Sequence, residues 1–321
     1  MIHMRTGVIG VGHLGRFHAQ KYAAISQLAG VFDENAERAA EVAAELRCRA
    51  FPSVDALLAE VDAVSIVTPT STHFAVAEVA MQAGVHCLIE KPFTLDTEEA
   101  DALIGMAQER HLVLAIGHIK RVHPAIQYLR QAGFGAPRYL EAERLAPFKP
   151  RSLDIDVIMD LMIHDLDLTL LLTGAEPVDV RAVGVAAVTD KADMATAWMT
   201  LNNGTVANLA ASRVVREPAR RMRIFWQDRY ASVDFLNNTL HIYHRGAGTV
   251  PGIPGVRDEA VDLAKRDALA AEIEDFLNAI AAHRPVFCDG VAGRRVLAAA
   301  LQVRVAVEAF LQRLEHHHHH H

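Results

Sequence analysis

The sequence predicts a two-domain α/β protein: an N-terminal doubly wound parallel sheet, then an α+β domain with an open, mostly antiparallel sheet. Three observations support this prediction. Strand-like and helix-like segments alternate up to residue 118, β-rich segments with little helix dominate later, and 321 residues suffice for two cores. We therefore predict domains at 1–118 and 119–313.

The first strand leads into a glycine-rich turn. "TGVIGVGHLGRFHA" places Gly10, Gly12 and Gly15 in the G-x-G-x-x-G spacing, between a β-run and a helical pattern. These glycines permit a tight turn, a close approach of pyrophosphate, and close helix–strand packing. The next strand, "LAGVF", ends at Asp33, whose carboxylate suits ribose hydroxyls. This unit predicts an NAD-binding Rossmann domain in which the cofactor contacts are Gly10, Gly12, His13, Leu14, Gly15 and Asp33.

The Asp33 carboxylate also favours NAD over NADP, because it would repel a 2′-phosphate. The nearest cation in the sequence, Arg38, lies one turn into the next helix. We expect it to lie too far away to offset that repulsion.

The later strands of this domain also end in polar side chains. We expect helices near 35–46, 53–60, 71–83 and 97–110, and strands in "DAVSIVT", "VHCLIE" and "LVLAIG". The strand ends carry Thr68-Pro69-Thr70, Glu90-Lys91-Pro92 and His118. Because ligands of such sheets bind at the carboxyl ends of the strands, we expect the site there.

After residue 118 the pattern changes to β-rich segments. "HPAIQYLRQAG" predicts a helix, and residues 137–145 predict a strand. "TAWMTLNNGTVANLAAS" predicts a hairpin that turns at Asn203-Gly204, and "MRIFWQD", "ASVDFL" and "LHIYH" continue an antiparallel meander. Residues 246–257, rich in Gly and Pro, predict a mobile loop. Helices near 267–283 and 291–313 follow, and we interpret residues 314–321 as an expression tag.

The helix around "DLMIHDLD" carries an unusual set of polar groups. Helical spacing places Asp160, His164 and Asp167 on one face and Asp165 elsewhere. Burying such groups is costly unless they are paired or line a wet cavity. The pattern therefore indicates a salt-bridged core helix or an active-site wall, and a divalent metal site is a third interpretation.

Composition excludes several classes of protein. The net charge of −7 argues against nucleic acid as the main partner, and no apolar run reaches the length of a membrane span. The N-terminus runs almost directly into a strand, so we expect no signal peptide. Cys48, Cys87 and Cys288 show no paired pattern. We therefore expect a cytoplasmic protein with no membrane partner.

Four motifs in this order make the chain resemble the Gfo/Idh/MocA family of nicotinamide-dependent oxidoreductases, which act mostly on sugars and other polyols. They are GVIGVGHLG, TPTSTH at 68–73, EKP at 90–92, and the Asp160, His164, Asp167 set. The resemblance implies NAD as cofactor, no metal, and a homodimer or homotetramer formed through the C-terminal sheet. It also implies that the catalytic residues are Lys91, Asp160 and His164. Further cofactor contacts are expected at Thr68, Pro69, His73, Glu90 and Lys91.

Oxidation of a secondary alcohol requires a group that accepts the hydroxyl proton. His164 suits general-base catalysis, and Lys91 can stabilise an alkoxide or act as the base itself. We favour His164, while the sequence leaves both open. A non-catalytic sensor that binds NAD and a ligand is an alternative, although the chain retains the whole set.

The substrate is the least determined feature. "DLMIHDLDL" with "ASRV" downstream looks like the branch of the family that oxidises nucleotide-linked amino sugars, such as UDP-N-acetylglucosamine at its 3-hydroxyl. Basic stretches at 148–151 and 212–223 suggest that Arg144, Arg151 and Arg213 bind an anionic group, since arginine forks suit phosphate. The alternatives are an inositol or free-sugar dehydrogenase, and arginines that are merely solvated.

Overall fold

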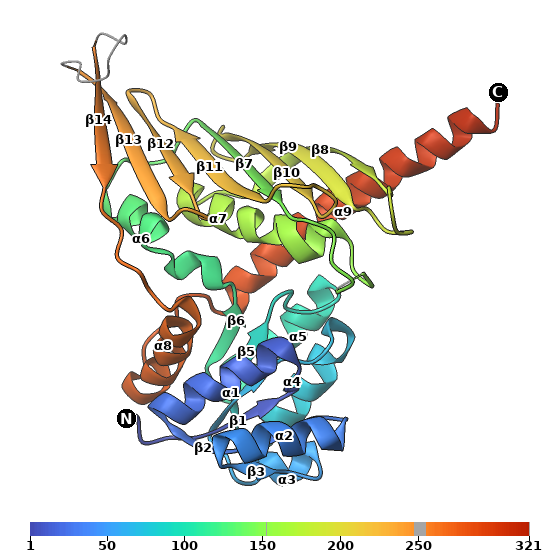
Figure 1. The fold of residues 1–321 in the computed structure, drawn as a ribbon, viewed down its shortest axis with the longest axis vertical. Coiled ribbons are helices and arrows are strands. Elements are labelled where there is room, and N and C mark those ends of the chain that lie inside the picture. The colour runs from blue at the N-terminus through green and yellow to red at the C-terminus, as the bar shows by residue number, and fades with distance from the viewer. Residues whose placement is uncertain (152, 247–254, 321) are drawn as a thin grey trace. The chain divides into compact units, whose positions relative to one another are not determined.

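The computed structural model describes residues 1–151, 153–246 and 255–320 and divides the chain into two compact units (Figure 1). Unit 1 comprises Met1–Val122 and Asp267–Leu297. Unit 2 comprises His123–Arg266 and Ala298–His321. Each unit has its own sheet and is described by itself.

Unit 1 contains a six-stranded parallel sheet in the order β3-β2-β1-β4-β5-β6. The chain leaves β1 in one direction and returns at β4 on its other side, which makes the gap between their carboxyl ends a topological switch point. Strands β4 and β6 are buried throughout, as expected of a sheet covered on both faces. Its elements are β1 (Arg5–Ile9), α1 (His13–Ile25), β2 (Gln27–Phe32), α2 (Ala36–Leu46), β3 (Arg49–Ala50), α3 (Val54–Leu58), β4 (Ala63–Ile66), the 3₁₀ turn η1 (Thr70–Thr72), α4 (His73–Gln82), β5 (His86–Glu90), α5 (Thr97–Glu109), β6 (Leu114–Gly117), η2 (Ile119–Val122), α8 (Ala268–Ala282) and the start of α9 (Gly290–His318).

Unit 2 contains an eight-stranded sheet in the order β14-β13-β12-β11-β7-β10-β9-β8. Among the described strands of this unit, only β7 and β10 pair in parallel. Burial alternates along β7, β9 and β10, so the sheet has one buried and one exposed face. Its elements are α6 (Pro124–Gln131), β7 (Tyr139–Leu145), the π-helical turn η3 (Ile158–Met162), α7 (Ile163–Thr173), β8 (Pro177–Val185), β9 (Met194–Leu201), β10 (Val206–Ser212), β11 (Ala219–Phe225), β12 (Arg229–Asp234), β13 (Thr239–Arg245), β14 (Val256–Val261) and the rest of α9.

The predicted fold class, a doubly wound parallel sheet followed by a mostly antiparallel one, is confirmed. The hairpin turns at Gly204, which has a φ of +89°, between β9 and β10. The predicted mobile loop at 246–257 falls largely on residues 247–254, which lie outside the described residues, and β14 already begins at Val256.

The compact units differ from the predicted division at 118 and 119 because residues 267–297 join unit 1. Helix α8 adds four apolar side chains to the unit 1 core, at the i, i+4, i+7 and i+8 spacing of one helical face: Leu269, Ile273, Phe276 and Leu277. Helix α9 begins close to β6, since a Cβ on Gly293 would lie 2.5 Å from the Ile116 side chain. The same helix continues to His318, into the residues interpreted as a tag.

Candidate active site

The glycine turn after β1 has the geometry that a dinucleotide requires. Gly10 has a φ of +91°, and a Cβ there would lie 2.6 Å from the Val67 carbonyl oxygen. A Cβ on Gly15 would clash with the Gly10 carbonyl. A Cβ on Gly12 would meet nothing within 4 Å. The three glycines therefore supply the turn, the close helix packing and an open approach to the backbone.

The first turn of α1 presents its backbone to solvent. Gly12 caps the helix without a side-chain hydrogen bond, and no acidic residue lies in the first turn. His13 and Leu14 are exposed, Leu14 with 41% of its surface accessible. Free N–H groups at the positive end of a helix dipole suit a pyrophosphate, so these residues fit NAD.

Asp33 is fixed at the end of β2 by backbone donors. Val11 N–H donates to its Oδ2 over 2.9 Å, and Asn35 N–H donates to its Oδ1 over 2.9 Å. Our expectation that Arg38 lies too far from this site is wrong. Its Nε donates to the Val11 carbonyl over 2.8 Å and its second terminal nitrogen reaches the Gly12 carbonyl at 3.5 Å, because α2 directs the long side chain back over the glycine turn.

The loop after β4 and the loop after β5 are joined by His73. Its Nε2 lies 2.9 Å from the Thr68 carbonyl, and its Nδ1 lies 3.0 Å from the Pro92 carbonyl. The His73 side chain is buried, with 1% of its surface accessible. Thr68 also accepts a hydrogen bond from the Thr72 hydroxyl. These contacts give His73 a role in holding both loops, and a contact with the nicotinamide ribose stays a prediction.

Lys91 directly follows β5 and is half-buried, while Glu90 beside it is buried. His118 is buried at the end of β6, and the buried Arg121 donates to the Phe287 carbonyl over 3.2 Å. The strand ends of unit 1 therefore gather the predicted glycine turn, Asp33, the 68–73 loop and Glu90-Lys91.

Unit 2 places its polar helix residues at two depths. Asp160 lies in the π-helical turn η3 and His164 in the first turn of α7, and both are half-buried. Asp165 and Asp167 are almost fully buried, with 2% and 1% of their surface accessible. Asp167 is thus more buried than the other two members of the predicted face.

Arg144, predicted to bind a substrate anion, forms a buried ion pair with Asp165. Its Nε and second terminal nitrogen donate to the two carboxylate oxygens over 3.2 and 2.9 Å. Only 3% of the Arg144 surface is accessible. This bidentate pair anchors α7 to β7. Whether the guanidinium also contacts a substrate stays a prediction.

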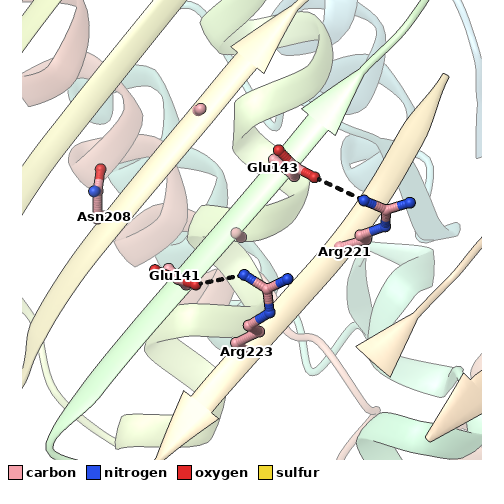
Figure 2. A pocket seen from close by; sticks show the side chains of 7 residues that line it. Glu141, Glu143, Asn208, Arg221 and Arg223 are labelled. Carbon is pink, nitrogen blue, oxygen red and sulfur yellow. Dashed lines mark hydrogen bonds and ion pairs between the residues drawn. The ribbon is translucent and has the colours of Figure 1, made fainter. Parts of the chain in front are cut away.

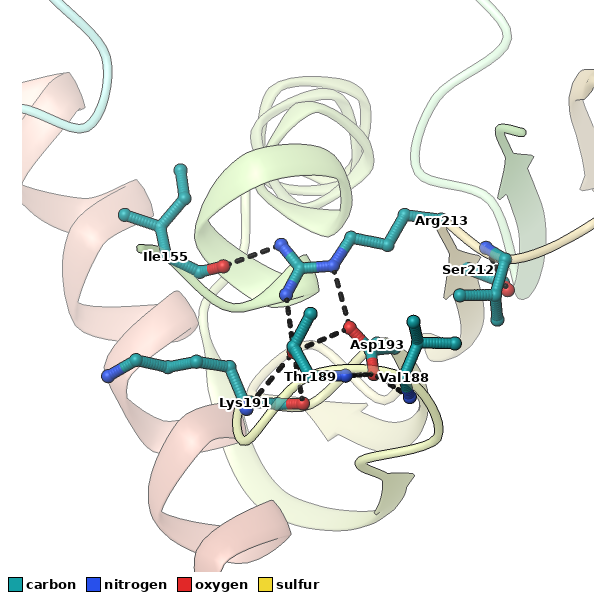
Figure 3. A network of polar contacts seen from close by, with 8 residues as sticks. Ile155, Val188, Thr189, Lys191, Asp193, Ser212 and Arg213 are labelled. Carbon is teal, nitrogen blue, oxygen red and sulfur yellow. Dashed lines mark hydrogen bonds and ion pairs between the residues drawn. The ribbon is translucent and has the colours of Figure 1, made fainter. Parts of the chain in front are cut away.

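Arg213 lies in the polar network of Figure 3. Its Nε donates to Asp193 over 3.0 Å, and its terminal nitrogens donate to the Ile155 carbonyl and the Thr189 hydroxyl over 2.6 and 3.2 Å. Arg213 thus connects the 188–193 loop to the segment before η3. Arg151 is exposed in the preceding loop. Substrate contacts of these two arginines also stay predictions.

His18 is not among the residues that the sequence patterns identified; it is fully buried and lies 2.8 Å from a Glu90 oxygen. The signal that could have identified it is its position on α1, where His18, Ala19 and Tyr22 share the buried face. Among the described residues, no group of three or more His, Cys, Asp or Glu side chains could hold a metal ion. In the same part of the chain, no helix is long and apolar enough to cross a membrane.

Comparisons with known proteins identify the family of both parts of the chain. Residues 4–118 match the family described as "Oxidoreductase family, NAD-binding Rossmann fold", and residues 116–230 match "GFO/IDH/MocA C-terminal domain". The chain belongs to the Gfo/Idh/MocA family. It is therefore an oxidoreductase that acts on CH–OH groups and has an NAD-binding domain, as the four motifs implied.

The similarity of this chain to other proteins ranges from near identity to about 30% sequence identity. Two solved structures of UDP-N-acetylglucosamine 3-dehydrogenase GnnA from Acidithiobacillus ferrooxidans are 96% and 97% identical, with TM-scores of 0.92 and 0.93. Each alignment covers 97% of this chain and 100% of that protein. Inositol 2-dehydrogenase from Rhizobium meliloti is 31% identical over 59% of this chain, and the chain spans 60% of that relative's length.

Proposed function

We propose that this protein oxidises the 3-hydroxyl of UDP-N-acetylglucosamine with NAD as the hydride acceptor. The observation that carries the proposal is the 96–97% identity to structures named UDP-N-acetylglucosamine 3-dehydrogenase, over the whole of those chains. Specificity in this family depends on side chains near the substrate, and few positions differ at this identity. Unit 1 would then hold the cofactor and unit 2 would supply residues for the sugar nucleotide.

In this proposal, side chains of the protein accept the hydroxyl proton and stabilise the oxygen that loses it. The glycine turn, the start of α1 and Asp33 would hold NAD, which would supply the hydride acceptor when bound. His164 accepts the proton from the hydroxyl as general base. Lys91 donates a hydrogen bond to the same oxygen and stabilises the negative charge that develops there. Asp160 orients the hydroxyl or the His164 ring.

A panel of substrates tests the proposal. We expect NADH production with UDP-N-acetylglucosamine, and a much lower kcat/KM with UDP-glucose, free N-acetylglucosamine and myo-inositol. Loss of the nucleotide removes contacts whose binding energy also serves the transition state, so truncated substrates lose kcat as well as affinity. A higher kcat/KM with myo-inositol or a free hexose would favour the inositol-dehydrogenase alternative, and no turnover with any of them would favour a sensor.

We further propose that the protein forms a homodimer or homotetramer through the exposed face of the unit 2 sheet. On this face, Glu141 and Glu143 of β7 lie opposite Arg223 and Arg221 of β11, with ion-pair distances of 3.0 and 3.5 Å (Figure 2). Asn208 of β10 lies beside them. A face with both signs of charge in ordered rows can be complementary to its own copy. We also propose a reducing cytoplasm as its location, because Cys48, Cys87 and Cys288 are scattered along the sequence without a paired pattern.

A further inference from the structure

A buried polar network in unit 1 leads from α1 to the residue before Lys91. The Tyr22 hydroxyl lies 2.7 Å from Ser65 Oγ, which lies 2.9 Å from His18 Nδ1. His18 Nε2 lies 2.8 Å from Glu90 Oε1. Tyr22, Ser65 and His18 have no accessible surface, and Glu90 has 8%. The proposed mechanism does not yet use these four side chains.

A carboxylate lies at one end of this network. Burial raises the pKa of Glu90, but the hydrogen bond and the charge of His18, followed by the charge and the backbone N–H of Lys91, outweigh it, so the net shift is downwards and the carboxylate is an acceptor. His18 therefore donates to Glu90 through Nε2–H. Its Nδ1 lies within hydrogen-bond distance of the Ser65 hydroxyl, and so does the Tyr22 hydroxyl, so each buried polar group of the network has a partner.

The Glu90 carboxylate is also confined on its other side. Its Oε2 accepts a hydrogen bond from the Lys91 backbone N–H over 3.2 Å. Gly117 pairs with Glu90 across β5 and β6, and a Cβ there would lie 2.8–2.9 Å from the carboxylate atoms. Any larger residue at 117 would displace the carboxylate. An anion is thus held at a fixed position beside the proposed catalytic lysine.

We propose that His18 and Glu90 are positioning residues for Lys91: His18 holds Glu90 as a fixed anion, and this anion keeps the Lys91 side chain positively charged and in place. A charged lysine donates a hydrogen bond to the substrate oxygen and cannot accept its proton. This is consistent with His164 as the base. The positioning role of His18 and Glu90 rests on the proposed function, since it requires that Lys91 acts on a substrate hydroxyl.

The other titratable groups of this region do not compete for the role. Burial raises the pKa of Tyr22, and the charges of Glu272, Cys87 and Glu90 raise it further, so Tyr22 stays a neutral donor. Burial raises the pKa of the Cys87 thiol to about 12. The charge of Glu272 in α8 affects the pKa of Tyr22, which is at the end of the network far from Lys91.

The isosteric variant Glu90→Gln tests the inference because it removes the charge and keeps the shape. We expect kcat with UDP-N-acetylglucosamine to fall about 10–100-fold, the range that a small misplacement of a reacting group costs. Without the anion, the lysine ammonium loses its proton more easily. The alkaline limb of the pH profile of kcat/KM should therefore move to lower pH, and kcat should fall more than NAD affinity does.

Variants of the network separate positioning from a general loss of structure. His18→Leu should resemble Glu90→Gln, and His18→Gln, which can still donate to Glu90, should recover part of kcat. Tyr22→Phe should have the smallest effect, because it removes only the terminal hydroxyl. In a Lys91→Ala background, Glu90→Gln should cause little further loss of kcat. Equal losses in both backgrounds, or an alkaline limb that does not move, would overturn the inference.

The proposed function can fail separately from this inference. If the wild-type protein does not oxidise UDP-N-acetylglucosamine, or if Lys91→Ala keeps its kcat, the proposed function fails. If wild type is active and Lys91→Ala is not, yet Glu90→Gln turns over normally, only the positioning role is wrong.

Discussion

Single residues carry the proton chemistry of the proposed reaction: His164 as the base, and Lys91 as the hydrogen-bond donor to the substrate oxygen. We predict that Lys91→Ala or His164→Ala lowers kcat by about 10²–10⁴-fold, the usual contribution of general acid–base catalysis. NAD affinity should change far less than kcat, because neither change touches the glycine turn or Asp33. Steady-state kinetics and a fluorescence titration with NAD measure the two effects. Lys265→Ala, at an exposed lysine, is the control. Near-wild-type turnover in Lys91→Ala or His164→Ala would remove the replaced residue from the mechanism.

The choice between NAD and NADP also depends on single residues. Asp33 would repel a 2′-phosphate, but Arg38 lies over the same glycine turn. We predict that the wild-type protein prefers NAD. In Asp33→Asn, the ratio of kcat/KM for NAD to kcat/KM for NADP should fall by about 10-fold, equivalent to about 1.4 kcal/mol. Once the carboxylate is neutral, Arg38 is available to pair with the phosphate.

The double variant Asp33→Asn/Arg38→Ala is the control for this prediction. It should lose the NADP activity that the single variant gains, as measured by kcat/KM for both cofactors. A wild-type preference for NADP, or a ratio unchanged by Asp33→Asn, would contradict the assignment of Asp33.

At the scale of elements, a buried ion pair fastens α7 to β7. We predict that Arg144→Met lowers the free energy of unfolding by about 3–5 kcal/mol, because it leaves Asp165 buried without its partner. The double variant Arg144→Met/Asp165→Leu should recover most of this loss. Arg221→Met, which breaks an exposed pair with Glu143, should cost about 0–1 kcal/mol. Urea unfolding measures all three. Unchanged stability with a raised KM would instead indicate that Arg144 binds the substrate.

Asp193, in the loop that Arg213 connects to the segment before η3, should make the free energy of unfolding depend on pH in the acid range. Burial raises the pKa of Asp193, but hydrogen bonds from Thr189, Val188 and Arg213 outweigh it and lower the pKa to about 2. A lowered folded-state pKa adds stability above the unfolded value near 4, and this stability is lost as pH falls through about 2.

We therefore predict that Asp193→Asn loses about 2 kcal/mol at pH 7, from a shift of nearly two pKa units. The variant should also show a smaller decline in stability between about pH 4 and 2 than wild type. Thermal unfolding across this range measures both effects, with Asp190→Asn, at an exposed neighbour, as the control. A wild-type pH slope in Asp193→Asn would show that the carboxylate does not titrate as described.

Local sequence patterns predicted the helices, the strands and the glycine turn. The roles of the buried polar residues depend instead on partners far away in the sequence. Each glycine of the turn follows from backbone geometry within a few residues, so the sequence predicts it. Arg144 and Asp165 are 21 positions apart, and Arg213 and Asp193 are 20 apart. Nothing local distinguishes an arginine that meets a carboxylate from one that meets a phosphate. The same limit hid His18, whose partner Glu90 is 72 positions away.

At the scale of the whole molecule, core membership could not be predicted from chain order. Helix α8 follows the unit 2 sheet in sequence, yet Ile273 and Phe276 complete the core of unit 1. An amphipathic pattern identifies the face of a helix that is buried, but it does not say which sheet receives that face.

The exposed face of the unit 2 sheet gives the last prediction, which concerns assembly. Beside the charged rows, Val183, Val185 and Trp198 are 41%, 47% and 44% exposed on neighbouring strands. Several large apolar side chains exposed on one face of a sheet favour an interface there. We predict a dimer or tetramer by size-exclusion chromatography with light scattering. Trp198→Glu should raise the dissociation constant of this oligomer by on the order of 100-fold, because an unpaired charge would be buried on association. Leu95→Glu, at a 50% exposed leucine of unit 1, should not. If Trp198→Glu assembles like wild type, the oligomer uses another surface.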